Sequence, residues 1–193
     1  MTRGAVAVRL AKMAVLAAIP LLVTACGGGS APPPGPVSPS TTAAPVDEFV
    51  PKTRTPDPAA VGIGLTTIAL SSTDKTDRVT FQFTGSAVPG WAVHYVKQAV
   101  SNTSTLSEFP VQGQSIIEVL IREAANPFES GVPPYSGPPV VTDPELRTIG
   151  EVRYASALRG VTQAFIGLAT PQRAFRVTAL TDPIRIVVEV DHK

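Results

Sequence analysis

Short runs in which apolar and polar residues alternate are the feature that most constrains the fold of this chain. In "RVTFQFT", residues 78–84, Val79, Phe81 and Phe83 fall on one side and polar residues on the other. This period of two is that of a β-strand, whose successive side chains point to opposite faces. The same period recurs in "SIIEVLIR" (115–122), "AFRVTAL" (174–180) and "IRIVVEV" (184–190).

Less regular apolar runs between Pro and Gly punctuation add further expected strands. The stretch 92–100 is open to a helical reading, since Val96, Ala99 and Val100 would share a helix face, but we favour a strand. About eight strands without a disulfide predict an all-β domain, a single antiparallel β-sandwich or a flattened barrel. The additional runs are 63–71, 91–96, 149–155 and 162–169.

The N-terminus has the form of an export signal. Three basic residues and no acid are followed by the uncharged run Met13–Ala25. At ~1.5 Å per residue its 13 residues are too short to cross roughly 30 Å of hydrocarbon. We therefore predict a cleaved signal peptide over residues 1–25.

The cleavage site points to a lipid anchor. Val23, Thr24 and Ala25 precede Cys26 in an order that resembles the bacterial lipobox, in which the cysteine receives a diacylglyceryl thioether and further acyl chains such as palmitate. An ordinary signal peptide with an incidental cysteine is the alternative, but a lone free thiol in an exported chain is a reactive liability. Two or three acyl chains give durable anchoring. We expect a lipoprotein on the extracytoplasmic face of the cell membrane.

The chain after Cys26 divides into a tether and one domain. Residues 26–60 are rich in Pro, Gly, Ser and Thr, which predicts a disordered tether. Residues 61–193 are long enough for one core. Without the signal peptide the chain holds 13 basic and 15 acidic residues, a balance of −2 that gives no reason to expect nucleic acid as a partner.

One long segment interrupts the strands. Residues 124–146 contain six prolines together with Phe128 and Tyr135. Loops of this length without secondary structure are often functional. Two alternatives stay open: the aromatic side chains pack back on the sheet, or they line a binding surface.

Several stretches together resemble the AMIN-like domain of actinobacterial secreted proteins and lipoproteins. They are "DRV" before an alternating strand, "PGWAVHYV", and "FRVTALTDPIRIVVEV" near the end, within residues 61–191. The resemblance implies a β-sandwich module of the cell envelope that serves localisation and peptidoglycan binding, with no assigned reaction. The family's closing strand usually has aspartate where this chain has Glu189.

No catalytic or metal-binding constellation stands out. His94 and His192 are the only histidines, Cys26 is the only cysteine, and neither G-x-S-x-G nor H-E-x-x-H occurs. Asp77-Arg78 and Asp182-x-x-Arg185 each place an acid and a base at a strand start, where such pairs clip a loop to a strand end. We expect no enzyme, no cofactor and no metal site.

Aromatic and polar side chains remain as candidates for a binding surface. Trp91, His94, Phe128 and Tyr135 have the chemistry to stack on sugars or hold a peptide, although Trp91 shares the apolar face of its strand and core packing is its alternative. The expected function is binding or localisation at peptidoglycan or an envelope protein. A carrier of a lipid or other apolar ligand would instead need a large apolar cavity, and a subunit of a membrane complex would need an exposed apolar patch.

Overall fold

The computed structural model describes residues 49–103, 107–122 and 131–193. The expected signal peptide, the lipobox residues Val23, Thr24 and Ala25, Cys26, and Phe128 lie outside the described residues. Residues 43–193 group as one compact unit. Every core residue of the described chain belongs to this unit.

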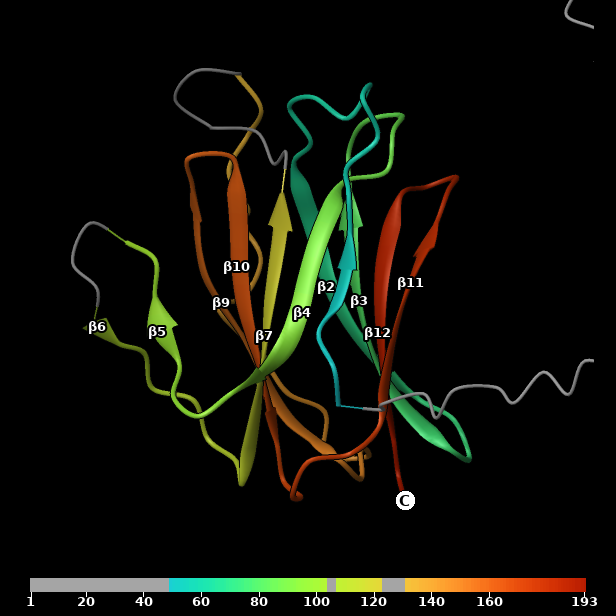
Figure 1. Ribbon diagram of the computed structural model, residues 1–193, viewed down its shortest axis with the longest axis vertical. Helices are drawn as coiled ribbons and strands as arrows, with labels where there is room; N and C mark the ends of the chain where they lie inside the picture. The colour runs from blue at the N-terminus through green and yellow to red at the C-terminus, as the bar shows by residue number, and fades with distance from the viewer. Residues whose placement is uncertain (1–48, 104–106, 123–130) are drawn as a thin grey trace, which may run out of the picture. The chain divides into compact units, whose positions relative to one another are not determined.

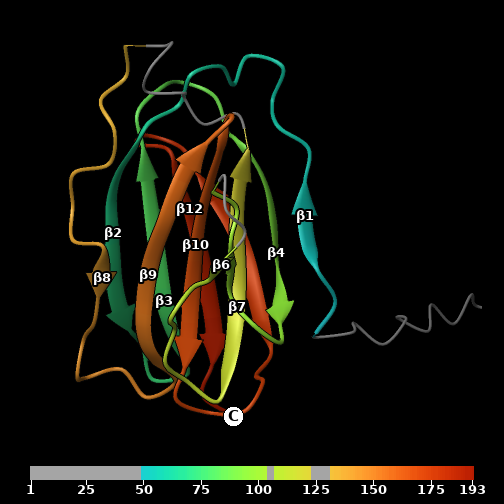
Figure 2. The same cartoon turned by 90° about the vertical axis from the view of Figure 1, so that its left-hand side faces the viewer.

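Two antiparallel sheets stack face to face, as Figure 2 shows, and neither closes on itself, so the predicted β-sandwich is confirmed over the flattened barrel. The six-stranded sheet has the order β1 (Lys52–Arg54), β4 (Gly90–Val96), β7 (Ser115–Arg122), β10 (Val161–Leu168), β9 (Ile149–Leu158), β8 (Val140–Val141). The four-stranded sheet has the order β11 (Phe175–Leu180), β12 (Arg185–Asp191), β3 (Thr76–Phe83), β2 (Leu65–Ser72). A separate ribbon pairs β5 (Val100–Ser101) with β6 (Ser107–Glu108).

The core lies between the two sheets and consists of the residues that the alternation predicts. Val79, Phe81 and Phe83 of β3 face inward and are at most 3% exposed. The apolar residues of β7 and β12 point into the same space and are buried to a similar degree. These residues are Ile117, Val119, Ile121, Ile186, Val188 and Val190.

The strand interpretation of residues 92–96 is confirmed, because β4 pairs in register with β7 over its whole length. After β4 the chain leaves the sheet and returns at β7, and the described residues of this excursion, 97–103 and 107–114, pack on the outer face of β10. Phe109 lies against Phe165 at 5.7 Å between ring centroids, and a Cβ at Gly167 would collide with the Gln112 carbonyl oxygen. The central strand β10 is consequently buried on both faces.

Strand β1 corrects the C-terminal end of the expected tether. Lys52–Arg54 lies within the range 26–60 but pairs with Val93, Ala92 and Trp91 of β4. The Lys52 amine lies over the ring of Phe175 and the Arg54 guanidinium over the ring of Trp91. A three-residue edge strand shows no sequence periodicity, so these pairings with distant rings are what keep the segment in the sheet.

Candidate functional site

Trp91 belongs to the core rather than to an open surface. Its side chain is 7% exposed, and the guanidinium of Arg54 lies 5.5 Å from the ring centroid. This position corrects the expectation that Trp91 offers a face for stacking on a sugar. The reason is its position in β4: residues two positions apart in a strand share a face, so Trp91 lies on the same inward face as Val93, which is fully buried.

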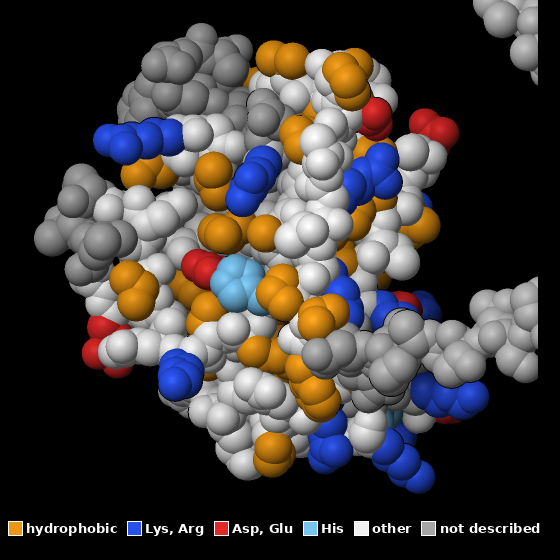
Figure 3. All heavy atoms as spheres, in the orientation of Figure 1, with side chains coloured by type: hydrophobic (Ala, Val, Ile, Leu, Met, Phe, Trp, Pro, Cys, Tyr) orange, Lys and Arg blue, Asp and Glu red, His pale blue; other side chains and the backbone are white. Residues whose placement is uncertain are grey.

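His94 points to the outer face of the six-stranded sheet and is 31% exposed. Its Nε2 lies 3.2 Å from Glu118 Oε2, directly across the β4–β7 ladder. Glu118 Oε1 accepts a hydrogen bond of 2.6 Å from Gln163 Nε2 on β10. In Figure 3 a histidine and an acidic side chain lie side by side among hydrophobic side chains on this surface.

Gln163 links this pair to the excursion 97–114. Its Nε2 also donates to the Val100 carbonyl at 2.9 Å, and its Oε1 accepts from the Asn102 amide at 2.8 Å. Asn102 Oδ1 in turn accepts a hydrogen bond from Ser156. Because Gln163 is only 2% exposed, this network serves to hold the excursion in place, and His94 is its accessible end. A lone Gln within the apolar run "TQAFIGLA" is the sequence signal for the network.

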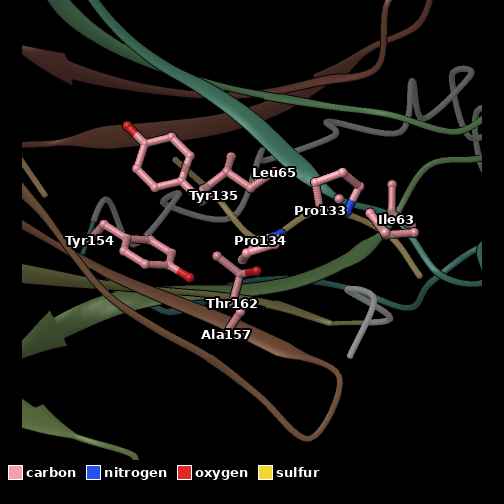
Figure 4. A pocket seen from close by; sticks show the side chains of 10 residues that line it. Ile63, Leu65, Pro133, Pro134, Tyr135, Tyr154, Ala157 and Thr162 are labelled. Atoms are coloured by element: carbon pink, nitrogen blue, oxygen red, sulfur yellow. The ribbon is translucent and has the colours of Figure 1, made fainter. Parts of the chain in front are cut away.

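Tyr135 packs back on the sheet, which is one of the two alternatives left open for the long loop. Its ring centroid is 4.8 Å from that of Tyr154 on β9, and burial raises the pKa of both phenols. Figure 4 shows the two tyrosines beside Pro134 and Thr162 around a small pocket. The pocket volume is about 10 Å³, room for about one water molecule.

A surface groove of about 580 Å³ with a mixed polar and apolar lining lies where β4 ends and β7 begins. The Tyr95 hydroxyl is fixed there, since it donates to the Arg173 carbonyl at 2.7 Å and accepts from the Arg173 amide at 2.8 Å. Burial raises the pKa of Tyr95. Lys97 has no carboxylate within 4.0 Å among the described residues. The lining residues are Tyr95, Val96, Lys97, Gly113, Gln114, Ser115, Ile116, Pro171 and Gln172.

Asp77 has the most hydrogen-bond partners of any side chain among the described residues, and it is 0% exposed. Its Oδ2 accepts from three consecutive backbone amides, those of Arg147 (2.9 Å), Thr148 (2.6 Å) and Ile149 (3.1 Å). Its Oδ1 accepts from Ser72 Oγ at 2.7 Å and from His192 Nε2 at 2.8 Å. Burial alone raises the pKa of this carboxyl, but these hydrogen bonds outweigh burial and hold it below 3.8.

The acid–base clips expected at two strand starts have different partners in the structure. Arg78 does not pair with Asp77 but forms an ion pair of 2.5 Å with Glu189 on β12. Arg185 donates only to the Pro183 carbonyl, at 3.4 Å, and no ion pair with Asp182 forms. Adjacent residues of a strand point to opposite faces, so Asp77 turns into the core while Arg78 faces outward.

Among the described residues no three side chains of His, Cys, Asp or Glu gather as metal ligands, and no helix there is both apolar and long enough to cross a membrane. The model of the AMIN-like domain matches residues 64–192, and the chain belongs to this family. AMIN-like domains are binding or localisation modules associated with the cell envelope, not a known catalytic family. Comparisons with curated proteins and with solved structures found no match.

Proposed function

We propose that this protein is a lipid-anchored, non-catalytic module that binds peptidoglycan in an actinobacterial envelope. The lipobox-like order before Cys26 supports an anchor on the extracytoplasmic face of the membrane. Family membership supports a role in envelope binding. In this proposal the tether ends before β1 and holds the sandwich at a distance from the bilayer.

The groove beside Tyr95 carries the proposal. Gln114 and Gln172 contribute amides, Ser115 a hydroxyl and Lys97 a cation, around an aromatic ring whose position is fixed by the Arg173 backbone. Amide and hydroxyl groups exchange hydrogen bonds with the hydroxyl and N-acetyl groups of a wall glycan. An aromatic ring supplies an apolar surface for a sugar ring.

The alternative function, a carrier of a lipid or other apolar ligand, needs space inside the sandwich. The sheets instead enclose side chains at close to zero exposure, and the pocket beside Tyr154 holds about 10 Å³. An acyl chain requires a pocket of roughly several hundred Å³. The packing therefore favours binding at the surface over carriage in the core.

Co-sedimentation with insoluble cell wall tests the proposal. The protein portion is residues 43–193, because this compact unit contains the whole core and β1. We expect pelleting that wall hydrolase treatment abolishes, and a loss of pelleting in the double variant Lys97→Ala/Gln172→Ala. Arg122→Ala, an exposed change at the other end of β7, is the matched control and pellets normally.

His94→Ala separates the groove from the outer sheet face. Retained pelleting of His94→Ala together with loss in the groove variant assigns wall binding to the groove. If the unaltered portion stays in solution at tens of micromolar, peptidoglycan binding by this domain is rejected.

A further inference from the structure

Strand β11 has a free edge. It is the outermost strand of the four-stranded sheet, and Figure 1 shows no strand of that sheet beyond it. The Asp191 amide donates to the Ala174 carbonyl at 2.9 Å, so the backbone groups of every second residue counted from Ala174 form hydrogen bonds with β12. By the alternation of an antiparallel ladder, the N–H and C=O groups of Phe175, Val177 and Ala179 point the other way. No backbone partner of these three residues lies on that side within the described chain.

A groove follows this edge. Its volume is about 450 Å³, and it is lined by the continuous stretch Ala174–Thr178 together with Lys52 of β1 and Asp191 of β12. The lining includes inward residues such as Phe175 and outward ones such as Arg176, so the groove runs along the strand rather than across one face of the sheet. An extended chain placed there has backbone groups to pair with.

A second groove of about 490 Å³ shares Arg176 and Asp191 with the first and therefore adjoins it. Its lining contains one further acid, Asp74, and three bases, Lys75, Arg147 and Lys193. None of these three bases has a carboxylate within 4.0 Å in the described part of the chain. Arg176 is already engaged by Asp191 and Glu189. Figure 3 shows Lys and Arg side chains gathered at the end of the molecule where the chain ends in Figure 1.

The remaining sheet edges are poorer templates. Strands β1 and β8 comprise three and two residues. Strand β2 is longer, but its pairing with β3 is irregular between Leu65 and Thr67. Short edges and irregular ones are the usual protections against pairing with another chain. Strand β11 has six residues, regular pairing and no proline.

We propose that the β11 edge binds an extended acidic peptide segment of another envelope protein. The peptide backbone pairs with Phe175, Val177 and Ala179 as an added strand, and its carboxylates contact Lys75, Arg147 and Lys193. Main-chain pairing supplies affinity in such complexes and side-chain contacts supply selectivity. This surface shares no lining residue with the Tyr95 groove, although the Tyr95 ring packs on Phe175 at 5.5 Å between centroids. The inference goes beyond wall binding and does not depend on it.

Peptide binding to residues 43–193 tests the inference by fluorescence polarisation. The probe is a labelled hexapeptide of alternating Glu and Val. Its matched controls are the same peptide N-methylated at alternate residues, in each of the two phases, and a Lys–Val hexapeptide. We expect the Glu–Val probe to bind saturably. The N-methylated peptide whose blocked amides face β11 and the Lys–Val peptide are both expected to bind about tenfold more weakly or worse.

Protein variants test the backbone edge of β11 and the basic groove beside it separately. Val177→Pro removes an outward N–H that β12 does not use, and Val177→Thr retains it. Lys75→Glu/Arg147→Glu reverses two charges, with Arg122→Glu as the charge control away from the groove. We expect Val177→Pro and the double charge variant to weaken probe binding about tenfold and both controls to bind normally.

Three results would overturn the inference. The first is that the Glu–Val probe does not bind at millimolar concentration. The second is that both N-methylated peptides bind as tightly as the unmodified probe. The third is that inorganic phosphate displaces the probe while Val177→Pro has no effect on probe binding. The last result would make the surface a simple anion site. The N-methylated peptides act on the unaltered protein, so the test stands even if Val177→Pro does not fold.

Discussion

The Asp77 carboxylate joins three parts of the chain that are far apart in sequence. It holds the start of β9 through three backbone amides, the end of β2 through Ser72, and the segment after β12 through His192. A buried carboxylate is costly unless it is hydrogen-bonded, and here both oxygens are occupied. The residue therefore sets the relative positions of the strand ends at this side of the sandwich.

Asp77→Ala is expected to lower the free energy of unfolding by about 3 kcal/mol, because buried amides lose their acceptor. Asp77→Asn keeps one oxygen to face the three amides and an NH₂ group that donates to Ser72, so its loss is smaller, about 1–2 kcal/mol. Urea unfolding followed by fluorescence of Trp91, the single tryptophan, measures both. Asp74→Ala, an exposed acid nearby, is the control, and equal losses in Asp74→Ala and Asp77→Ala would contradict the role of Asp77.

The same carboxyl predicts a pH dependence. Its folded pKa is lowered from 3.8, so its contribution to stability is present above that pH and is lost as the pH falls through the folded pKa. We expect the free energy of unfolding to decrease from about pH 4 downward, with a shallower decrease in Asp77→Asn. Chemical denaturation at a series of acidic pH values shows whether the two slopes differ; parallel slopes would refute the assignment.

Residue-level prediction from sequence was limited by long-range contacts. The period of two in β3 predicts which of its side chains face inward. The burial of Trp91 can be predicted because it shares a strand face with Val93. The role of Asp77 does not, because its partners are up to 115 positions away and three of them are backbone amides. The network around Gln163 is hidden for the same reason. Only an acid or an amide within an apolar strand pattern signals such residues.

At the scale of elements, the alternation predicted β3, β7, β11 and β12, and the less regular apolar runs predicted β2, β4, β9 and β10. The structure confirms these strands. The four strands that were missed, β1, β5, β6 and β8, have three or two residues each, too few to show a period. Their place in the fold depends on partners in other strands. The excursion over 97–103 and 107–114, which buries the outer face of β10, was missed because its anchors are hydrogen bonds to Gln163 and the packing of Phe109.

Strand β1 is small but is expected to stabilise the sandwich. Shortening the protein from residues 43–193 to residues 55–193 removes the hydrogen-bonded ladder between β1 and β4 and the cation–π contacts of Lys52 and Arg54. We expect the shorter portion to be less stable by about 1–3 kcal/mol in urea unfolding. Arg54→Ala in the longer portion isolates one contact and costs about 0.5–1 kcal/mol. Equal stability of the two portions would show that β1 is only loosely held.

At the scale of the whole molecule, the proposed lipid anchor at Cys26 would decide where the sandwich acts. Produced in an actinobacterial host that lipidates exported proteins, the full chain is expected in the membrane fraction, in the detergent phase of a phase separation, and labelled by an alkyne palmitate analogue. Cys26→Ser removes the acceptor thiol, so label and detergent partitioning are both expected to be lost. Unchanged partitioning of Cys26→Ser would rule out a lipid anchor at this residue.

The position of β12 has a consequence for how the molecule is made. It lies between β11 and β3 in the four-stranded sheet, yet it follows both in the chain. Strand β3 therefore leaves the ribosome about a hundred residues before β12, and until then β2 alone can pair with it. Contacts this distant in sequence slow folding. Until β12 arrives, one edge of β3 has no hydrogen-bonding partner, so the incomplete sheet is open to pairing with another chain until its last strand is delivered.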